Sequence, residues 1–175
     1  MKGIFSPLPP DTLEAALEPI ADYCESLAWV LDLCSGPLEY PYWDEDDPKN
    51  VLDQLHDQDG LPMGWFERGF LPKHAHCLVL DDWGYYLGFN PDAVSVAALV
   101  QELKPEQGLS PDGRLFDFLK KTDLLFVMRV APEWWEAYCS DQDLLEKLRQ
   151  GWDGRWVDSD RWLSKEFPKY PNSLS

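Results

Sequence analysis

The stretch 74–90 constrains the fold most, because it carries the clearest strand–turn–strand signal in the chain. It reads HAHCLVLDDWGYYLGFN, with a short apolar run, then Asp81 and Asp82, and then an aromatic-rich run. Aromatic residues suit a pleated, half-buried surface, and Asp and Gly favour tight turns. The sequence therefore predicts a β-hairpin over 76–89.

A hairpin of two strands is only marginally stable alone, so other segments must cover it. The run 124–130 (LLFVMRV) is almost wholly apolar, which indicates a central strand of the same sheet. Capping residues and apolar periodicity predict about five to six helices in the rest of the chain. We therefore expect an α+β fold. A small mixed or antiparallel sheet, formed by hairpin 76–89 and strand 124–130, would be packed by these helices.

Helical periodicity is strongest near the N-terminus. Apolar or small residues recur in steps of four and three from Leu13 to Cys34, which predicts one helical stripe, kinked or divided at Pro19. Start signals and apolar stripes predict further helices over the following ranges: 47–59, 91–104, 110–121, 132–138 and 144–151.

The length of 175 residues fits one domain with a substantial core. Residues 1–10 are predicted to be a lead-in punctuated by prolines, and 61–73 an ordered loop whose rings pack inward. We expect a single globular domain over 1–175. Its acidic N-terminal part (11–60) would be helical, and its aromatic-rich C-terminal tail (152–175) would pack on the body.

The charge is strongly negative and unevenly placed. The formal net charge is −17, and up to Gly60 fourteen Asp and Glu residues stand against two Lys. Such a field repels nucleic-acid phosphates and anionic lipid headgroups, and it attracts basic surfaces. We therefore predict a basic protein partner, no nucleic-acid binding and no membrane binding.

Targeting and redox signals are consistent with a cytoplasmic protein. The sequence has no cationic start followed by an apolar stretch, and no apolar run approaches the length of a membrane span. Its four cysteines lack a paired spacing. We therefore expect a soluble, cytoplasmic protein with free, buried thiols.

His74, His76 and Cys77 form a cluster of metal-type ligands. On a strand the two histidines would share one face, whereas Cys77 would point to the other. Because no second ligand pair stands at a recognisable spacing, we predict a strand-edge histidine pair, no metal and no cofactor. The first alternative is a metal-dependent enzyme or metal-binding domain that uses His74 and His76 with Asp81 or Asp82.

Other catalytic signals are absent from the sequence. It has no nucleophile elbow, phosphate-binding loop or dinucleotide fingerprint, which favours a protein that is not an enzyme. The adjacent Trp134 and Trp135 and the tryptophans of the tail can stack on sugars or anchor a partner. A carbohydrate-binding module built on exposed tryptophans is the second alternative.

Acidic and aromatic residues concentrate in and after the linker 38–47. Tyr42 and Trp43 are suited to anchor a contact, while the acids steer a basic partner toward it. The residues that we predict to bind the partner are Tyr42, Trp43, Asp44, Glu45, Asp46, Asp47, Asp57 and Asp59.

In its general profile the chain resembles cytoplasmic immunity proteins that neutralise bacterial toxins. It is small, strongly acidic, aromatic-rich and poor in catalytic motifs. The sequence therefore predicts an acidic cytoplasmic protein that binds or inhibits another protein, and that neutralises a toxin by docking on its basic surface. The composition does not set an oligomeric state.

Overall fold

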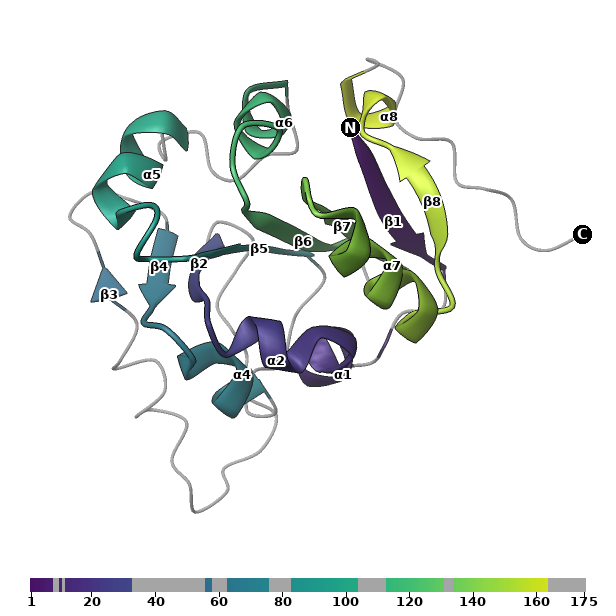
Figure 1. Cartoon of the computed structure of the whole chain (residues 1–175), viewed down its shortest axis with the longest axis horizontal. Coiled ribbons are helices and arrows are strands. Elements are labelled where there is room, and N and C mark those ends of the chain that lie inside the picture. Colours follow the sequence, from purple (N-terminus) through teal and green to yellow (C-terminus); the bar gives the residue numbers. More distant parts are fainter. Residues whose placement is uncertain are drawn as a thin grey trace, which may run out of the picture.

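An eight-stranded sheet dominates the computed structural model (Figure 1). The structure describes residues 1–7, 10, 12–32, 56–57, 63–75, 83–103, 113–130 and 134–163. The strands are β1 (Lys2–Ser6), β2 (Ala28–Asp32), β3 (His56–Asp57), β4 (Met63–Phe66), β5 (Trp83–Phe89), β6 (Leu125–Val130), β7 (Trp134–Tyr138) and β8 (Arg155–Asp158).

The strand order is β3-β4-β2-β5-β6-β7-β1-β8, and every pairing is antiparallel. The N-terminal strand β1 lies between two strands from the C-terminal part of the chain. Gly3 is paired with Tyr138 of β7, and Lys2 is paired with Asp158 of β8. The two ends of the described chain thus meet in one part of the sheet.

Short helices cover both faces of the sheet. Helices α1, α2, α4 and α7 lie on one face, and α5, α6 and α8 lie on the other (Figure 1). The helices are α1 (Leu13–Leu17), the 3-10 helix η1 (Glu18–Ile20), α2 (Ala21–Cys24), α4 (Phe70–His74), α5 (Val96–Leu103), α6 (Gly113–Leu119), α7 (Gln142–Gly151) and α8 (Asp160–Leu163).

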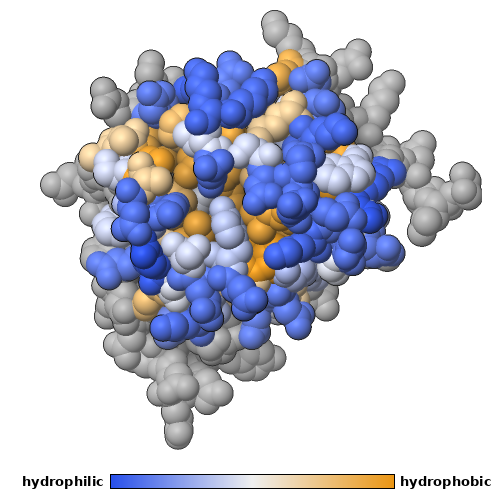
Figure 2. Space-filling model, viewed as in Figure 1, coloured by the Kyte–Doolittle hydropathy of each residue, from blue (hydrophilic) through white to orange (hydrophobic). Residues whose placement is uncertain are grey.

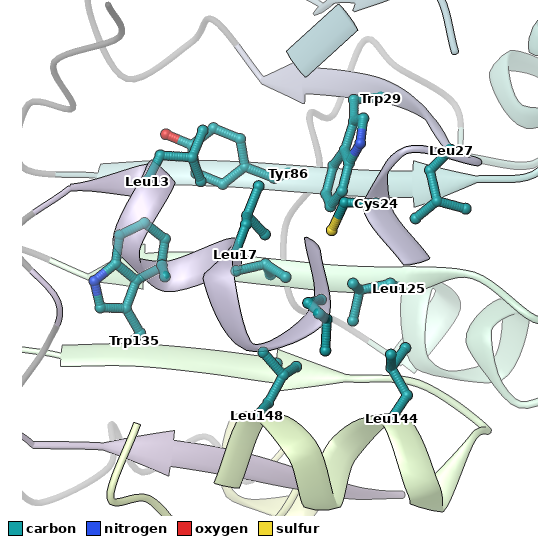
Figure 3. Close-up of a cluster of buried hydrophobic side chains, with 14 of the residues drawn as sticks. Leu13, Leu17, Cys24, Leu27, Trp29, Tyr86, Leu125, Trp135, Leu144 and Leu148 are labelled. Carbon is teal, nitrogen blue, oxygen red and sulfur yellow. The ribbon is translucent and has the colours of Figure 1, made fainter. Parts of the chain in front are cut away.

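The first core lies between the sheet and helices α1, α2, α4 and α7 (Figure 3). Trp29 and Trp135 are among its largest fully buried side chains. Their neighbour Trp152 closes the end of α7 and donates a hydrogen bond of 2.8 Å from its indole nitrogen to the carbonyl of Ala16. This bond ties α7 to α1 across the core.

The second core lies on the opposite face, beneath α5 and α6. Its centre holds Phe5, Phe126 and Tyr138, all buried, and Phe116 of α6 meets Tyr138 edge-on with ring centroids 4.9 Å apart. Two apolar faces therefore leave the central strands buried on both sides. No described helix is long and apolar enough to cross a bilayer.

The prediction of a small sheet packed by five to six helices is wrong. The described sheet has eight strands, and only α5, α6 and α7 reach seven residues among the described helices. Strand β5 is paired with β2 and β6, while residues 76–82, which include the other predicted hairpin arm, lie outside the described residues.

The single helical stripe predicted from Leu13 to Cys34 is also wrong. The chain is helical from Leu13 to Cys24, with the 3-10 turn at Pro19, and then forms strand β2. Trp29 packs in the first core and Val30 in the second, so the buried side chains alternate with a period of two. Because both faces of β2 are buried, its apolar residues also match a helical spacing, although the segment is a strand.

Three further segments differ from the prediction for a related reason. Residues 134–138, predicted as a helix, form strand β7, in which all five residues are buried. Residues 1–10, predicted as a lead-in, contain β1, and 61–73, predicted as a loop, contains β4 and the start of α4. Each strand is buried by neighbours that lie far away in the sequence.

The apolar run 124–130 was predicted correctly as a central strand beside 83–89, since β6 pairs with β5. The helix that ends at Gly151 is α7, which begins after Asp141, whose carboxylate accepts hydrogen bonds from the amides of Asp143 and Leu144. Such a cap satisfies amides that a helix start leaves without partners. Of the tail, 164–175 lies outside the described residues.

Candidate functional site

Most of the residues predicted to bind a partner lie outside the described residues. This holds for Tyr42, Trp43, the acids at 44–47 and Asp59. Asp57 lies on β3, a strand at the end of the sheet, where it is paired with Gly64. The structure therefore neither brings these residues together nor separates them.

The histidine prediction is wrong for His74. This residue lies in helix α4 rather than on a strand, and its ring stacks on Phe70 with centroids 4.3 Å apart. His76 and Cys77 lie outside the described residues. Within the part of the chain that the structure describes, no group of three or more His, Cys, Asp or Glu side chains is placed to hold a metal ion.

The tryptophan pair does not form an exposed sugar-stacking platform. Because Trp134 and Trp135 are neighbours on strand β7, they point to opposite faces, where one is 7% exposed and the other is fully buried. Among the described tail residues, Trp152 is buried and Trp156 on β8 is exposed.

Cys24 and Cys139 are free and buried, as expected from their spacing. Burial raises the pKa of each thiol to about 12. Both thiols are therefore protonated at neutral pH, which makes them poor nucleophiles.

Exposed carboxylates lie along α1, η1 and α2, on the adjacent loops and in the first turn of α7. We call this set the acidic surface; it consists of Glu14, Glu18, Asp22, Glu25, Asp123, Asp141 and Asp143, all exposed. The sequence contains no Lys or Arg between Lys2 and Lys49, so the helical part of this surface has no base of its own.

Tyr23 connects helix α2 to the loop that carries Asp123. It belongs to α2, and its hydroxyl lies 3.5 Å from the carbonyl oxygen of Asp123. Burial, followed by the nearby Cys139, Asp141 and Asp123, raises the pKa of Tyr23 to about 12. Tyr23 is therefore a half-buried ring close to Asp123 and Asp141.

A second constellation, which the sequence did not single out, surrounds Glu136 in the second core. Glu136 is fully buried on β7, and its carboxylate accepts hydrogen bonds from the Tyr138 hydroxyl at 2.6 Å and the Trp162 indole at 2.8 Å. Its other oxygen lies 2.5 Å from Nη2 of Arg161, on α8. Each oxygen of the buried carboxylate thus has a polar partner.

Strand geometry and pairing explain why Tyr138 and Glu136 meet. Tyr138 lies two residues after Glu136, so both side chains leave the same face of β7. The residue paired with Tyr138 on β1 is Gly3, where an added Cβ would lie 2.3 Å from the tyrosine ring. Glycine therefore gives the ring the space beside β1 that it occupies in this structure.

Burial raises the pKa of Glu136, while Arg161 and the hydrogen bonds from Tyr138, Trp162 and Trp134 lower it by less. Burial also raises the pKa of Tyr138, with Glu136 as the second cause. The signal that could have identified this site is a lone acid in the otherwise apolar and aromatic run WWEAY.

The raised pKa of Glu136 predicts a particular pH dependence of stability. The folded protein holds this proton more tightly than the unfolded chain, in which the pKa is near 4.5. The stability linked to Glu136 is therefore full below that value and is lost as pH rises through the folded pKa. We expect the free energy of unfolding of the wild type, minus that of Glu136→Gln, to fall over this window.

Urea denaturation from about pH 4 to pH 8 measures this difference. Glu146 and Asp158, whose pKa values are lowered, are present in both proteins and cancel. A difference that stays constant or rises with pH would contradict the expected burial effect.

Comparison of the chain with protein-family models, curated proteins and solved structures finds no match.

Proposed function

We propose that this protein is a non-enzymatic binding protein whose acidic surface docks on a basic surface of another protein. In its finer form, the proposal is a cytoplasmic immunity-type inhibitor that neutralises a toxin. The observation that carries the proposal is the acidic surface, in which seven exposed acids lie along α1, η1 and α2, on the adjacent loops and in the first turn of α7. Figure 2 shows hydrophilic residues over much of the face that carries α1 and α7.

Electrostatic steering gives this arrangement its mechanism. With a net charge of −17, the protein carries a long-range negative field, and exposed carboxylates lie along α1, η1 and α2, a stretch without Lys or Arg. Such a field raises the association rate of a basic partner and makes that rate fall with ionic strength. Tyr23, half-buried among these acids, is suited to be an aromatic contact residue.

The test begins with a pull-down from the native source at low and high salt. A basic protein retained at low salt is identified, purified and used to measure association rates. Asp22→Asn with Glu25→Gln is expected to lower the association rate roughly two- to tenfold and to weaken its salt dependence, because two steering charges are lost. Inhibition of the partner's toxic activity on co-expression tests the finer form.

Glu102→Gln with Asp117→Asn is the matched control. It changes the charge by the same amount at exposed positions on α5 and α6, on the other side of the sheet. This control is expected to keep most of the wild-type rate. The proposal fails if no basic protein is retained at low salt, or if both double variants associate at the wild-type rate.

A further inference from the structure

The Glu136 constellation has the composition of a site for a guanidinium group. We call the set Phe5, Glu136, Tyr138 and Trp162 the Glu136 cage. The guanidinium carbon of Arg161 lies 5.2 Å from the centroid of the Phe5 ring and 5.5 Å from that of Trp162, while its Nη2 reaches the Glu136 carboxylate at 2.5 Å. The cation thus contacts two aromatic rings and one anion.

These surroundings favour a guanidinium group over an ammonium group. The planar, weakly hydrated guanidinium stacks on aromatic faces and forms directional hydrogen bonds to a carboxylate. Tyr138 and Trp162 occupy Oε2 of Glu136, which leaves Oε1 facing the cation. In this structure the cage thus holds one guanidinium against one carboxylate oxygen.

A buried carboxylate strongly favours a bound cation or a bound proton. Glu136 is fully buried, so an ionised carboxylate without a partner would be costly at this position. Arg161 meets this requirement in the present structure. Its side chain is 19% exposed, so the cation position lies close to solvent while the carboxylate lies deep in the core.

The element that supplies the cation is small. Helix α8 has four residues, none of them buried, and Leu163 at its end is 43% exposed. Both Arg161 and Trp162 of this helix contact Glu136. The ion pair and this hydrogen bond therefore tie the short helix to β7.

We infer that the Glu136 cage is a guanidinium-binding site, filled in this structure by Arg161 and open to an arginine side chain of a basic partner when the Arg161 side chain leaves it and α8 stays in place. The role of a partner's arginine rests on the proposed function. The affinity of the cage for guanidinium does not, since Arg161 already demonstrates the contact within the chain.

Chemical rescue tests the cage with methylguanidinium as the probe. Arg161→Ala removes the internal cation, and methylguanidinium at tens of millimolar is expected to raise the melting temperature of this variant by about 3 °C. Methylammonium and sodium chloride at the same concentration are expected to raise it by much less. The double variant Arg161→Ala with Glu136→Gln should not respond selectively to methylguanidinium.

Arg155→Ala is the matched control. The guanidinium of Arg155 also lies over Phe5, at 4.8 Å, but on the exposed strand β8. This variant keeps Arg161 in the cage and is therefore expected to gain no selective stabilisation. If Arg161→Ala does not fold unaided, its recovery during refolding with methylguanidinium is measured, together with the melting temperature of Arg161→Gln.

The inference is overturned if methylguanidinium stabilises neither Arg161 variant more than methylammonium does. Binding of a partner's arginine is tested on Arg161→Ala with a blocked Gly-Arg-Gly peptide, which should raise the melting temperature, whereas Gly-Lys-Gly should not. An equal effect of the two peptides would overturn the part of the inference that concerns a partner's arginine. Neither readout uses the acidic surface, so failure here is distinguishable from failure of the proposed function.

Discussion

Replacement of Trp135 by alanine is expected to lower the free energy of unfolding by about 3–5 kcal/mol. Trp135 is fully buried in the first core, and its indole nitrogen donates a hydrogen bond of 2.9 Å to the carbonyl of Pro10. Its ring lies near Tyr86 and Trp152, with centroids 6.3 Å away in each case. The change removes a large apolar side chain and leaves a cavity where three rings meet.

Urea denaturation followed by far-ultraviolet circular dichroism measures this loss, because the signal does not depend on the tryptophan that is removed. Trp156→Ala is the control, since Trp156 is 42% exposed on the edge strand β8. We expect this control to cost less than about 1 kcal/mol. Equal losses at the two positions would show that Trp135 does not lie in the core.

The second large effect is expected at the buried ion pair. Arg161→Met leaves Glu136 buried without its cation and is expected to cost about 3–5 kcal/mol at neutral pH. The double change Glu136→Met with Arg161→Met removes both charges and is expected to cost clearly less than the sum of the two single changes, because neither charge is left without its partner.

A double-mutant cycle from urea denaturation gives the coupling between the two residues. Glu146 and Arg149 on the surface of α7 provide the comparison, since their side chains also form an ion pair, with Nη2 of the arginine 2.6 Å from the carboxylate. Exposed pairs of this kind typically contribute less than about 1 kcal/mol. A coupling for Glu136 and Arg161 that is no larger than the surface value would mean that burial does not strengthen this pair.

Segments with a strong local signal were predicted correctly from the sequence. The run 124–130 is too apolar for an exposed position, and it became the central strand β6. Helix α7 combines a capping aspartate, Asp141, with an apolar stripe that ends near Gly151, so its start and end are both encoded locally. In both segments the nearby residues alone determine the structure.

Segments whose structure depends on distant partners were not predicted. Leu27, just before β2, and Leu31 within it continue the spacing of the preceding helix, and only pairing with β4 and β5 makes the segment a strand. In β7 both faces are buried, which removes the alternation typical of a half-exposed strand. The contact between Glu136 and Arg161 depends on where α8 lies against β7, which no local pattern specifies.

The place of β1 between β7 and β8 has a consequence for the order of events during synthesis. Both neighbours of this N-terminal strand belong to the last third of the described chain, because Gly3 is paired with Tyr138 and Lys2 with Asp158. The ribosome therefore releases β1 long before either partner strand exists. Closing such long loops slows folding. The β7-β1-β8 end of the sheet is thus expected to be completed only after translation of β8. Until β7 and β8 are translated, β1 has neither of its partner strands.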